Sequence, residues 1–531
     1  MAVLKKGDWK APFMGISNNY SSGRDSLGLQ TTSQASYSTL LPGLTNLTNR
    51  IRYYGFYCWL LEMYAINEGD TDPKVQNRFM RRGEYMIALL MQVHEKSALQ
   101  IPGSTFAAEE TVNHSNSTLY DLSYAADISK DKKTYWQYSS GAFGQYYAGA
   151  LQSLGLIVYR DDSPVFVCTS NEDNSIISGT LLAKAFEKNI SKSAKELFLH
   201  NIQNGVLKIS DTKSLFDEFA ISHVPLKTEE WNLYTKLLFT NDLPLFQSAD
   251  NRTYFRKNTL LTVLSYIDTI HDAAHWDYFY YELYNRHGLN FYNNETESSF
   301  GWYYYQLNEY WHFAVESIFW ALLHTLSTKY FQVQLVEFLN DFHLIFVKSI
   351  FELGLITDEN QTIESIITNT QIEDARYISD EINKSIKDAD VHKTVYLGFK
   401  MLIIIYKQNF DEFNKLRNFA AFNGMERDGD CISGLIEFSI GASVPVKDFL
   451  TKFLLKNLIN RHLEVAYRKM GSGIKNTLKF SYEDNFLKHV ETIYPVWTTP
   501  RIYAMHSCFK DLGYIDNDGS ISNIGKDLIS I

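Results

Sequence analysis

The chain has 531 residues, of which 45% are hydrophobic and 15% aromatic, and it carries a formal net charge of −11. This length exceeds the size of a single hydrophobic core, so we expect roughly three or four domains. The negative charge argues against a protein coated in nucleic acid or lying on an anionic membrane, and no apolar run approaches the ~18 residues of a membrane span.

The four cysteines lie far apart in the sequence, at Cys58, Cys168, Cys431 and Cys508. They form neither a CxxC metal motif nor a compact disulfide framework, which predicts free thiols in a reducing compartment. The N-terminal residues lack the apolar segment of a signal peptide. We therefore expect a cytoplasmic protein.

Residues 1–44 are rich in Ser, Gly, Thr and Asn and show no periodicity, which predicts an irregular N-terminal arm. A helical domain is expected at 45–200, and Thr45 or Thr48 can cap its first helix. Arg50 and Arg52 lie in the first turn of that helix, where the helix dipole disfavours cations. This placement predicts an anionic partner, either a nearby carboxylate or a phosphate.

The dipeptide Asp72-Pro73 predicts the start of the next helix, which runs to about Glu95, because Asp caps helices and Pro fits their first position. Three arginines lie in its first half, and we interpret them as a solvated face: Arg78, Arg81 and Arg82.

Residues 146–188 predict a helix that ends at Gly155, a hairpin and a further helix. Glycine enters the left-handed conformation without a Cβ penalty and so caps helices. Two short apolar segments flank the turn that follows, which is the pattern of a hairpin. The same order returns at 500–531 around Gly513, and a similar Leu-Gly-Leu-Ile sequence surrounds Gly354 without a second strand. The order is that of a winged helix, and we expect winged-helix-like modules at 146–188 and 500–531.

The segment 201–395 is expected to form an aromatic-rich helical domain around one long buried helix, which includes 300–326. Candidate metal ligands fall at helical spacing in this region. Asp268, His271, Asp272 and His275 would share one face, and Glu309-x-x-His312 has the spacing used in carboxylate-bridged di-iron sites. The alternatives are a divalent-metal site built from His271, His275, Glu309 and His312, and a structural hydrogen-bond network with no cofactor.

The remaining segment, 396–531, contains a basic helix at 446–470 and the last module. Residues 394–406, which are highly apolar, fit either a buried helix or a strand. Between Lys447 and Lys479, eight basic residues stand against two acidic ones. Phosphate contact is one interpretation and a solvated face the other. The candidate nucleic-acid contacts are Lys456, Arg461, Arg468, Lys469, Lys475 and Lys479.

Signatures of common enzymes are absent from the sequence. The loop at 470–477 is rich in glycine, but it follows a helix and lacks the Gly-Lys-Ser/Thr order of a Walker loop. No GxSxG, HExxH or GxGxxG motif is present, so a non-enzymatic protein is favoured.

At Leu40–Leu61, and at the modules around Gly155 and Gly513, the chain resembles uncharacterised winged-helix-containing proteins of bacterial antiphage-defence and restriction loci. The resemblance covers about a quarter of the chain and carries over no functional residue. It implies a cytoplasmic subunit that engages invading DNA or a partner protein.

The sequence thus predicts a mainly α, multi-domain helical protein with small winged-helix-like modules. The first functional hypothesis is a non-enzymatic DNA-engaging or scaffolding subunit of a bacterial antiphage-defence complex. It would contact other subunits, and double-stranded DNA through the basic stripe, but no membrane. The alternatives are a metal-dependent, nuclease-like hydrolase and a purely protein–protein interaction subunit.

Overall fold

A computed structural model describes residues 25–95, 100–113, 118–128, 133–173, 176–239, 252–270, 273–285, 298–472 and 476–530. The chain forms two compact units. Unit 1 comprises Met1–Thr39 and Tyr278–Thr499, and unit 2 comprises Leu40–Asp277 and Pro500–Ile531. Each unit therefore combines segments that lie far apart in the sequence. The domains expected from the sequence are instead continuous segments that follow one another along the chain.

Unit 1 is a helical assembly with one small antiparallel sheet, in the strand order β5-β7-β6. Its helices are α1 (Gln30–Leu40), α12 (Phe279–Asn285), α13 (Ser298–Lys329), α14 (Leu335–Glu352), α15 (Ile363–Asn369), α16 (Ala375–Lys387), α17 (Val391–Asn409), α18 (Phe413–Phe422), α19 (Cys431–Ile440), α20 (Val446–Phe453) and α21 (Arg461–Gly471). Its strands are β5 (Val333–Gln334), β6 (Phe480–Glu483) and β7 (Phe486–His489).

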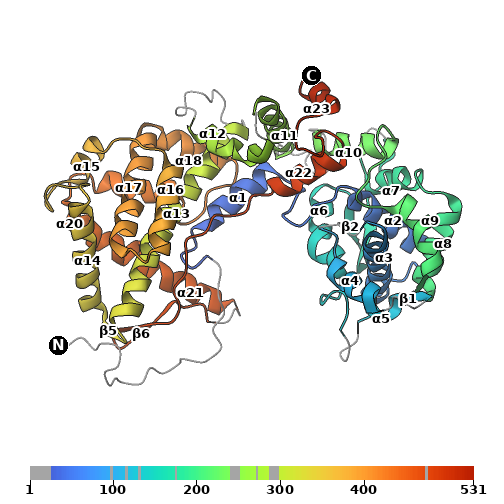
Figure 1. Cartoon of the computed structure of the whole chain (residues 1–531), viewed down its shortest axis with the longest axis horizontal. Helices are drawn as coiled ribbons and strands as arrows, with labels where there is room; N and C mark the ends of the chain where they lie inside the picture. The colour runs from blue at the N-terminus through green and yellow to red at the C-terminus, as the bar shows by residue number, and fades with distance from the viewer. Residues whose placement is uncertain are drawn as a thin grey trace. The chain divides into compact units, whose positions relative to one another are not determined.

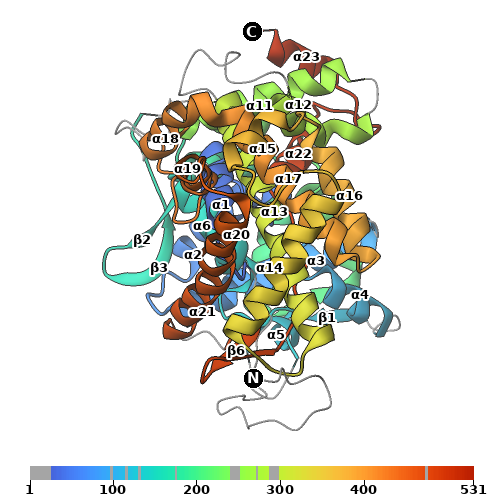
Figure 2. The same ribbon diagram turned by 90° about the vertical axis from the view of Figure 1, so that its left-hand side faces the viewer.

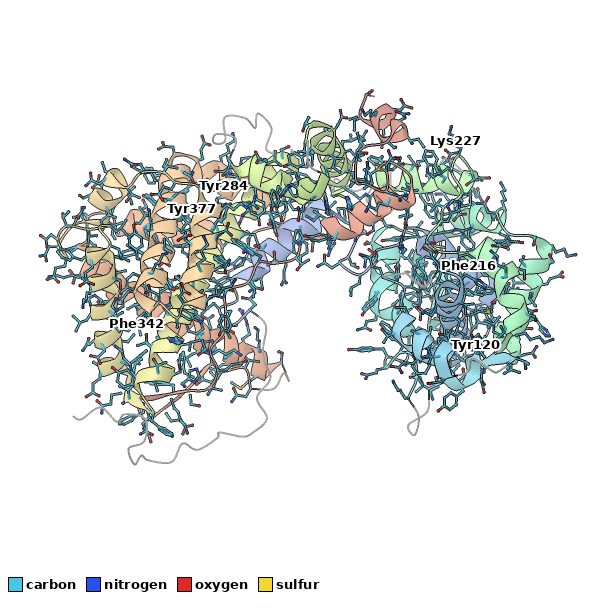
Figure 3. All side chains as sticks on the ribbon, in the orientation of Figure 1. Tyr120, Phe216, Lys227, Tyr284, Phe342 and Tyr377 are labelled. Carbon is cyan, nitrogen blue, oxygen red and sulfur yellow. The ribbon has the colours of Figure 1, made fainter. Side chains whose placement is uncertain are left out.

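Helix α13 lies at the centre of unit 1, as its apolar sequence predicts. It is buried on all sides along most of its length, and it packs against α17, which resolves residues 394–406 as a helix (Figure 1). Phe342 on α14 and Tyr284 on α12 are both buried in this unit (Figure 3). Such a core needs helices that are apolar nearly all round.

Unit 2 contains two small antiparallel sheets, β1-β4 and β2-β3. Its helices are α2 (Arg52–Asn67), α3 (Pro73–His94), α4 (Ser104–Asn113), α5 (Leu122–Ala126), α6 (Ala148–Ser153), α7 (Gly179–Glu187), α8 (Lys192–Asn204), α9 (Thr212–Phe219), α10 (Glu229–Phe239), α11 (Arg252–Thr269), α22 (Ile502–Asp511) and α23 (Asn523–Ile529). Its strands are β1 (Leu119–Asp121), β2 (Ile157–Arg160), β3 (Ser163–Cys168) and β4 (Val206–Lys208).

Helix α2 is buried along most of its length and packs against α7 and α3. The two arginines near its start have carboxylate partners, as one of the two interpretations expected. Arg50 Nη1 lies 2.6 Å from Asp511 Oδ1, and Arg52 Nε lies 3.1 Å from Glu230 Oε1. Helix α3 begins as predicted, because the Asp72 side chain accepts a hydrogen bond from the Lys74 amide.

The expectation of an irregular N-terminal arm is wrong for residues 30–40, which form α1. Small hydroxyl side chains let this helix pack closely, and Thr32, Ser33 and Ser36 are fully buried. The Ser36 hydroxyl donates to the Thr32 carbonyl at 2.8 Å, within the helix itself. Tertiary packing here outweighs the weak helix propensity of Ser and Thr.

The fold is thus mainly helical with small antiparallel sheets. Among the helices that the structure describes, none combines the length and the apolar composition of a membrane-spanning segment.

Candidate functional sites

The predicted basic stripe lies in unit 1, and Arg461 at the start of α21 is held by the chain's own oxygens. Its Nε donates to the Leu27 carbonyl at 2.8 Å. Its Nη1 and Nη2 donate at 2.8 Å to the side chain and the carbonyl of Asp428. A guanidinium with these partners has few donors left for a phosphate.

Two lysines of the stripe, Lys469 and Lys479, are also held within unit 1, whereas Lys456 is 68% exposed and forms only a surface ion pair with Glu437. Lys469 Nζ donates to the Asp25 carbonyl at 2.6 Å. The Lys479 side chain is 1% exposed and pairs with Glu491, and Lys456 Nζ lies 2.5 Å from Glu437 Oε1. Arg468 is exposed, and Lys475 lies outside the described residues. The stripe therefore presents fewer available cations than its sequence suggests.

Two of the four candidate metal ligands, Glu309 and His312, lie together on α13. His271 lies outside the described residues. His275 is exposed and belongs to unit 2, whereas Glu309 and His312 belong to unit 1. The expected helical face from Asp268 to His275 does not form as one helix, because α11 ends at Thr269. Within the described ranges, no three His, Cys, Asp or Glu side chains gather closely enough to hold a metal ion.

Glu309, His312 and Glu316 instead form a buried charged centre on α13. His312 Nε2 lies 3.0 Å from Glu309 Oε1. His312 Nδ1 lies 3.7 Å from Glu316 Oε2, which is an ion-pair distance rather than a hydrogen bond. Burial by itself lowers the pKa of His312, but the two carboxylates outweigh it and raise the pKa to about 10. The imidazole is therefore charged at neutral pH.

Both carboxylates of this centre also bind remote segments of unit 1. Glu309 accepts hydrogen bonds from the amide of Thr498 at 2.8 Å and from its hydroxyl at 2.7 Å. Glu316 accepts from the Gln30 side chain at 2.8 Å and from the Val496 amide at 3.2 Å. The centre thus fastens α1 and the segment before Pro500 to α13, which is a structural role.

Unit 2 also contains a buried carboxylate that sequence reasoning missed, Glu84 on α3. It accepts hydrogen bonds from the hydroxyls of Tyr57 and Tyr135 and from the amides of Ala142, at 3.0 Å, and Phe143, at 2.7 Å. Burial raises its pKa although these donors lower it. Phe143 opens a π-helical turn, Phe143–Tyr147.

The interpretation of the α3 arginines as a solvated face is wrong for Arg81, which is 1% exposed. Its guanidinium donates to the carbonyls of Ala126, Trp136 and Tyr138 at 2.6, 3.0 and 2.5 Å. The only available signal was the position of Arg81 and Glu84 beside the apolar half of the helix.

The first module, residues 146–188, has the predicted order of helix, glycine, hairpin and helix. Gly155 has a φ of +70°. The Thr169 hydroxyl donates to the Gly155 carbonyl at 2.6 Å, and the Thr169 amide donates to the Leu156 carbonyl at 2.9 Å. A Cβ at Gly179 would lie 2.0 Å from that carbonyl oxygen, so only glycine allows α7 to approach so closely.

The last module, residues 500–531, repeats these contacts. Gly513 has a φ of +72°. The Ser522 hydroxyl donates to the Gly513 carbonyl at 2.6 Å, and the Ser522 amide donates to the Tyr514 carbonyl at 2.9 Å. A Cβ at Gly525 would lie 2.3 Å from the Tyr514 oxygen. The two segments share one hydrogen-bond pattern, while their assignment to the winged-helix fold stays a prediction.

Comparison with known proteins assigns no function to these sites. No protein-family model, curated protein or solved structure matches the chain.

Proposed function

We propose that the protein is a non-enzymatic scaffolding subunit that docks a partner protein through the hairpin of the first module. In keeping with the resemblance described above, the setting we propose is a bacterial antiphage-defence complex. The observation that carries the proposal is the β2-β3 hairpin (Figure 2), which is fixed to unit 2. Its side chains Val158 and Tyr159 are exposed to solvent.

The hairpin is held to α3 by the side chain of Gln76. Gln76 Nε2 donates to the Phe166 carbonyl at 2.8 Å, and the Phe166 amide donates to Gln76 Oε1 at 2.8 Å. The Gln76 amide therefore pairs with β3 much as a neighbouring strand would. A surface fixed in this way loses little conformational entropy when it binds a partner.

Tyr159 is the apolar anchor that this hairpin offers. Its ring stacks on Phe166 with a centroid distance of 4.2 Å and is nevertheless 53% exposed, beside Val158 at 37%. A tyrosine fixed on one face and open on the other is the kind of residue that dominates binding energy in protein interfaces.

The charges at both hairpin turns favour a protein partner over DNA. The first turn contains Arg160, Asp161 and Asp162, and the last module has Asp516 and Asp518 around its turn. Phosphates would be repelled by these carboxylates, whereas DNA-binding surfaces carry Lys and Arg. Together with the cations of the basic stripe that are held within unit 1, this favours scaffolding over the DNA-engaging alternative.

The test uses the proteins encoded beside this chain's gene as candidate partners, with affinities measured by biolayer interferometry. Tyr159→Ser should weaken a specific complex at least about tenfold, because loss of an aromatic anchor typically costs more than 1 kcal/mol. Tyr467→Ser on α21 is the matched control, since Tyr467 is 52% exposed.

Short duplex DNA provides the opposing test. If the protein is a scaffold, it should not bind short duplex DNA with an affinity that falls steeply as the salt concentration rises. Salt-sensitive duplex binding that is lost in Arg468→Ala and unaffected by Tyr159→Ser would overturn the proposal in favour of DNA engagement.

A further inference from the structure

A pocket of about 700 Å³ opens on the surface of unit 2, where the start of α4 faces the segment 133–137 and Tyr146. Helix α4 packs along α3 (Figure 1). No residue of the β2-β3 hairpin lines the pocket. The volume falls within the range of small-molecule sites in proteins. None of the contacts assigned above to docking involves this pocket.

Aromatic side chains form its walls, and their positions are fixed. Trp136 meets Tyr146 edge to face with a centroid distance of 5.3 Å, and its indole Nε1 donates to Gln145 Oε1 at 2.8 Å. Tyr135 donates its hydroxyl to Glu84 and stacks under the guanidinium of Arg81. The pocket therefore offers flat apolar faces held in place by the buried network of α3.

The polar groups of the pocket are mostly neutral. Asn49, Ser104, Thr105 and Gln137 line it, and their side chains form no hydrogen bond with the residues that the structure describes. The charged lining residues, Lys133 and Glu109, lie 2.8 Å apart and offset one another. Amides and hydroxyls that lack protein partners are available to a ligand that both donates and accepts hydrogen bonds.

From these features we propose that the pocket binds a nucleobase. A nucleobase has a flat π face for stacking on Trp136 or on Tyr146, whose rings are perpendicular, and an edge of alternating donors and acceptors for the amides of Asn49 and Gln137. The balanced rim does not favour a polyphosphate or another multiply charged ligand. The base could belong to a free nucleoside or to an unstacked position in a single strand, and both sources present the same chemistry.

The probes are adenosine, guanosine, cytidine and thymidine, a single-stranded oligonucleotide of mixed sequence, and the duplex of the same sequence. Binding to the full chain is measured by calorimetry. We expect saturable binding of at least one nucleoside or of the single strand, and none that is specific to the duplex. Competition by the free nucleoside against the oligonucleotide distinguishes the two sources, since a strand-specific site resists displacement.

Trp136→Ala should weaken this binding about tenfold or more, because base stacking on an aromatic side chain contributes about 1–3 kcal/mol. Gln137→Ala, at an exposed position, disturbs folding less and should change the preference among the four bases. Tyr467→Ala in unit 1 should change neither property.

The absence of saturable binding up to millimolar concentrations of every probe would overturn the proposal. Binding that both Trp136→Ala and Gln137→Ala leave unchanged would also overturn it, because the base would then lie elsewhere. Neither result bears on the hairpin, since loss of partner docking in Tyr159→Ser is measured separately.

Discussion

The carboxylate of Glu84 in unit 2 and the pair Glu309 and Glu316 in unit 1 are all buried beside aromatic helices, but different groups surround them. Glu84 receives two hydroxyls and two amides, which are neutral donors. The nearby Arg81 gives its guanidinium to three carbonyls. In unit 1, His312 lies between the two carboxylates as a cation.

The difference shows two ways of burying a carboxylate. Neutral donors satisfy its hydrogen-bonding capacity but leave part of the cost of burying charge, which is why burial raises the pKa of Glu84. A counter-charge offsets that cost, and its removal then leaves two anions uncompensated. The site around Glu309 and Glu316 should therefore depend on a single side chain more strongly than the site around Glu84 does.

The largest effect is expected from His312→Leu. Loss of the cation leaves Glu309 and Glu316 buried without a counter-charge, so the free energy of unfolding of unit 1 should fall by about 3–5 kcal/mol. Chemical denaturation, with hydrogen exchange measured separately in α13 and α3, locates the loss in one unit.

His462→Leu is the matched control within unit 1. His462 is fully buried, and burial lowers its pKa to about 4. Its Nδ1 lies 3.0 Å from the Ser26 carbonyl, and its Nε2 accepts from the Lys479 amide. Replacing this neutral histidine should lower the free energy of unfolding of unit 1 by only about 1–3 kcal/mol. If His312→Leu and His462→Leu lost the same free energy of unfolding, the charge of His312 would not explain its effect.

The pH dependence of unit 1 gives the next largest effect. The pKa of His312 is raised from 6.5 to about 10, so its stabilisation is complete below pH 6.5 and is lost as the pH rises toward 10. Between pH 7 and pH 9 unit 1 should lose about 2–3 kcal/mol. The pKa of Glu84 is raised from 4.5, so the corresponding loss in unit 2 begins at lower pH.

Denaturation of the wild type and of His312→Leu at both pH values isolates this contribution. Burial also lowers the pKa of Lys469, and the contribution of this lysine is common to both proteins. A wild-type slope that persists unchanged in the variant would assign the pH dependence to other groups.

Local features of this fold could be predicted from the sequence because short-range chemistry determines them. Glycines in the left-handed conformation end helices at Gly155, Gly354 and Gly513, and Asp72 caps α3 as expected. The all-round apolar sequence of α13 likewise predicts its burial. These signals lie within a few residues of the structure they specify.

The side chains of the candidate sites contact partners that are remote in the sequence. These contacts could not be predicted from the sequence. Arg461 meets the Leu27 carbonyl across 434 positions, and neither composition nor periodicity indicates such a contact. The sequence places Arg81 on the surface because its partners are backbone carbonyls. Every residue has a backbone carbonyl, so the sequence gives no sign of which ones Arg81 contacts.

The smallest effect is expected from Glu84→Gln, which keeps the shape of the side chain and removes its charge. Tyr57 and Tyr135 can rotate their hydroxyls to accept from the new amide, but the amides of Ala142 and Phe143 can only donate, so one donor loses its acceptor. The loss should be about 1–3 kcal/mol. Glu309→Gln should cost more, because it also takes a counter-charge from His312. If Glu84→Gln instead destabilised unit 2 as much as His312→Leu destabilises unit 1, Arg81 would be acting as a counter-ion through space despite its carbonyl partners. The contrast between the neutral donors around Glu84 and the charged histidine beside Glu309 and Glu316 would then fail.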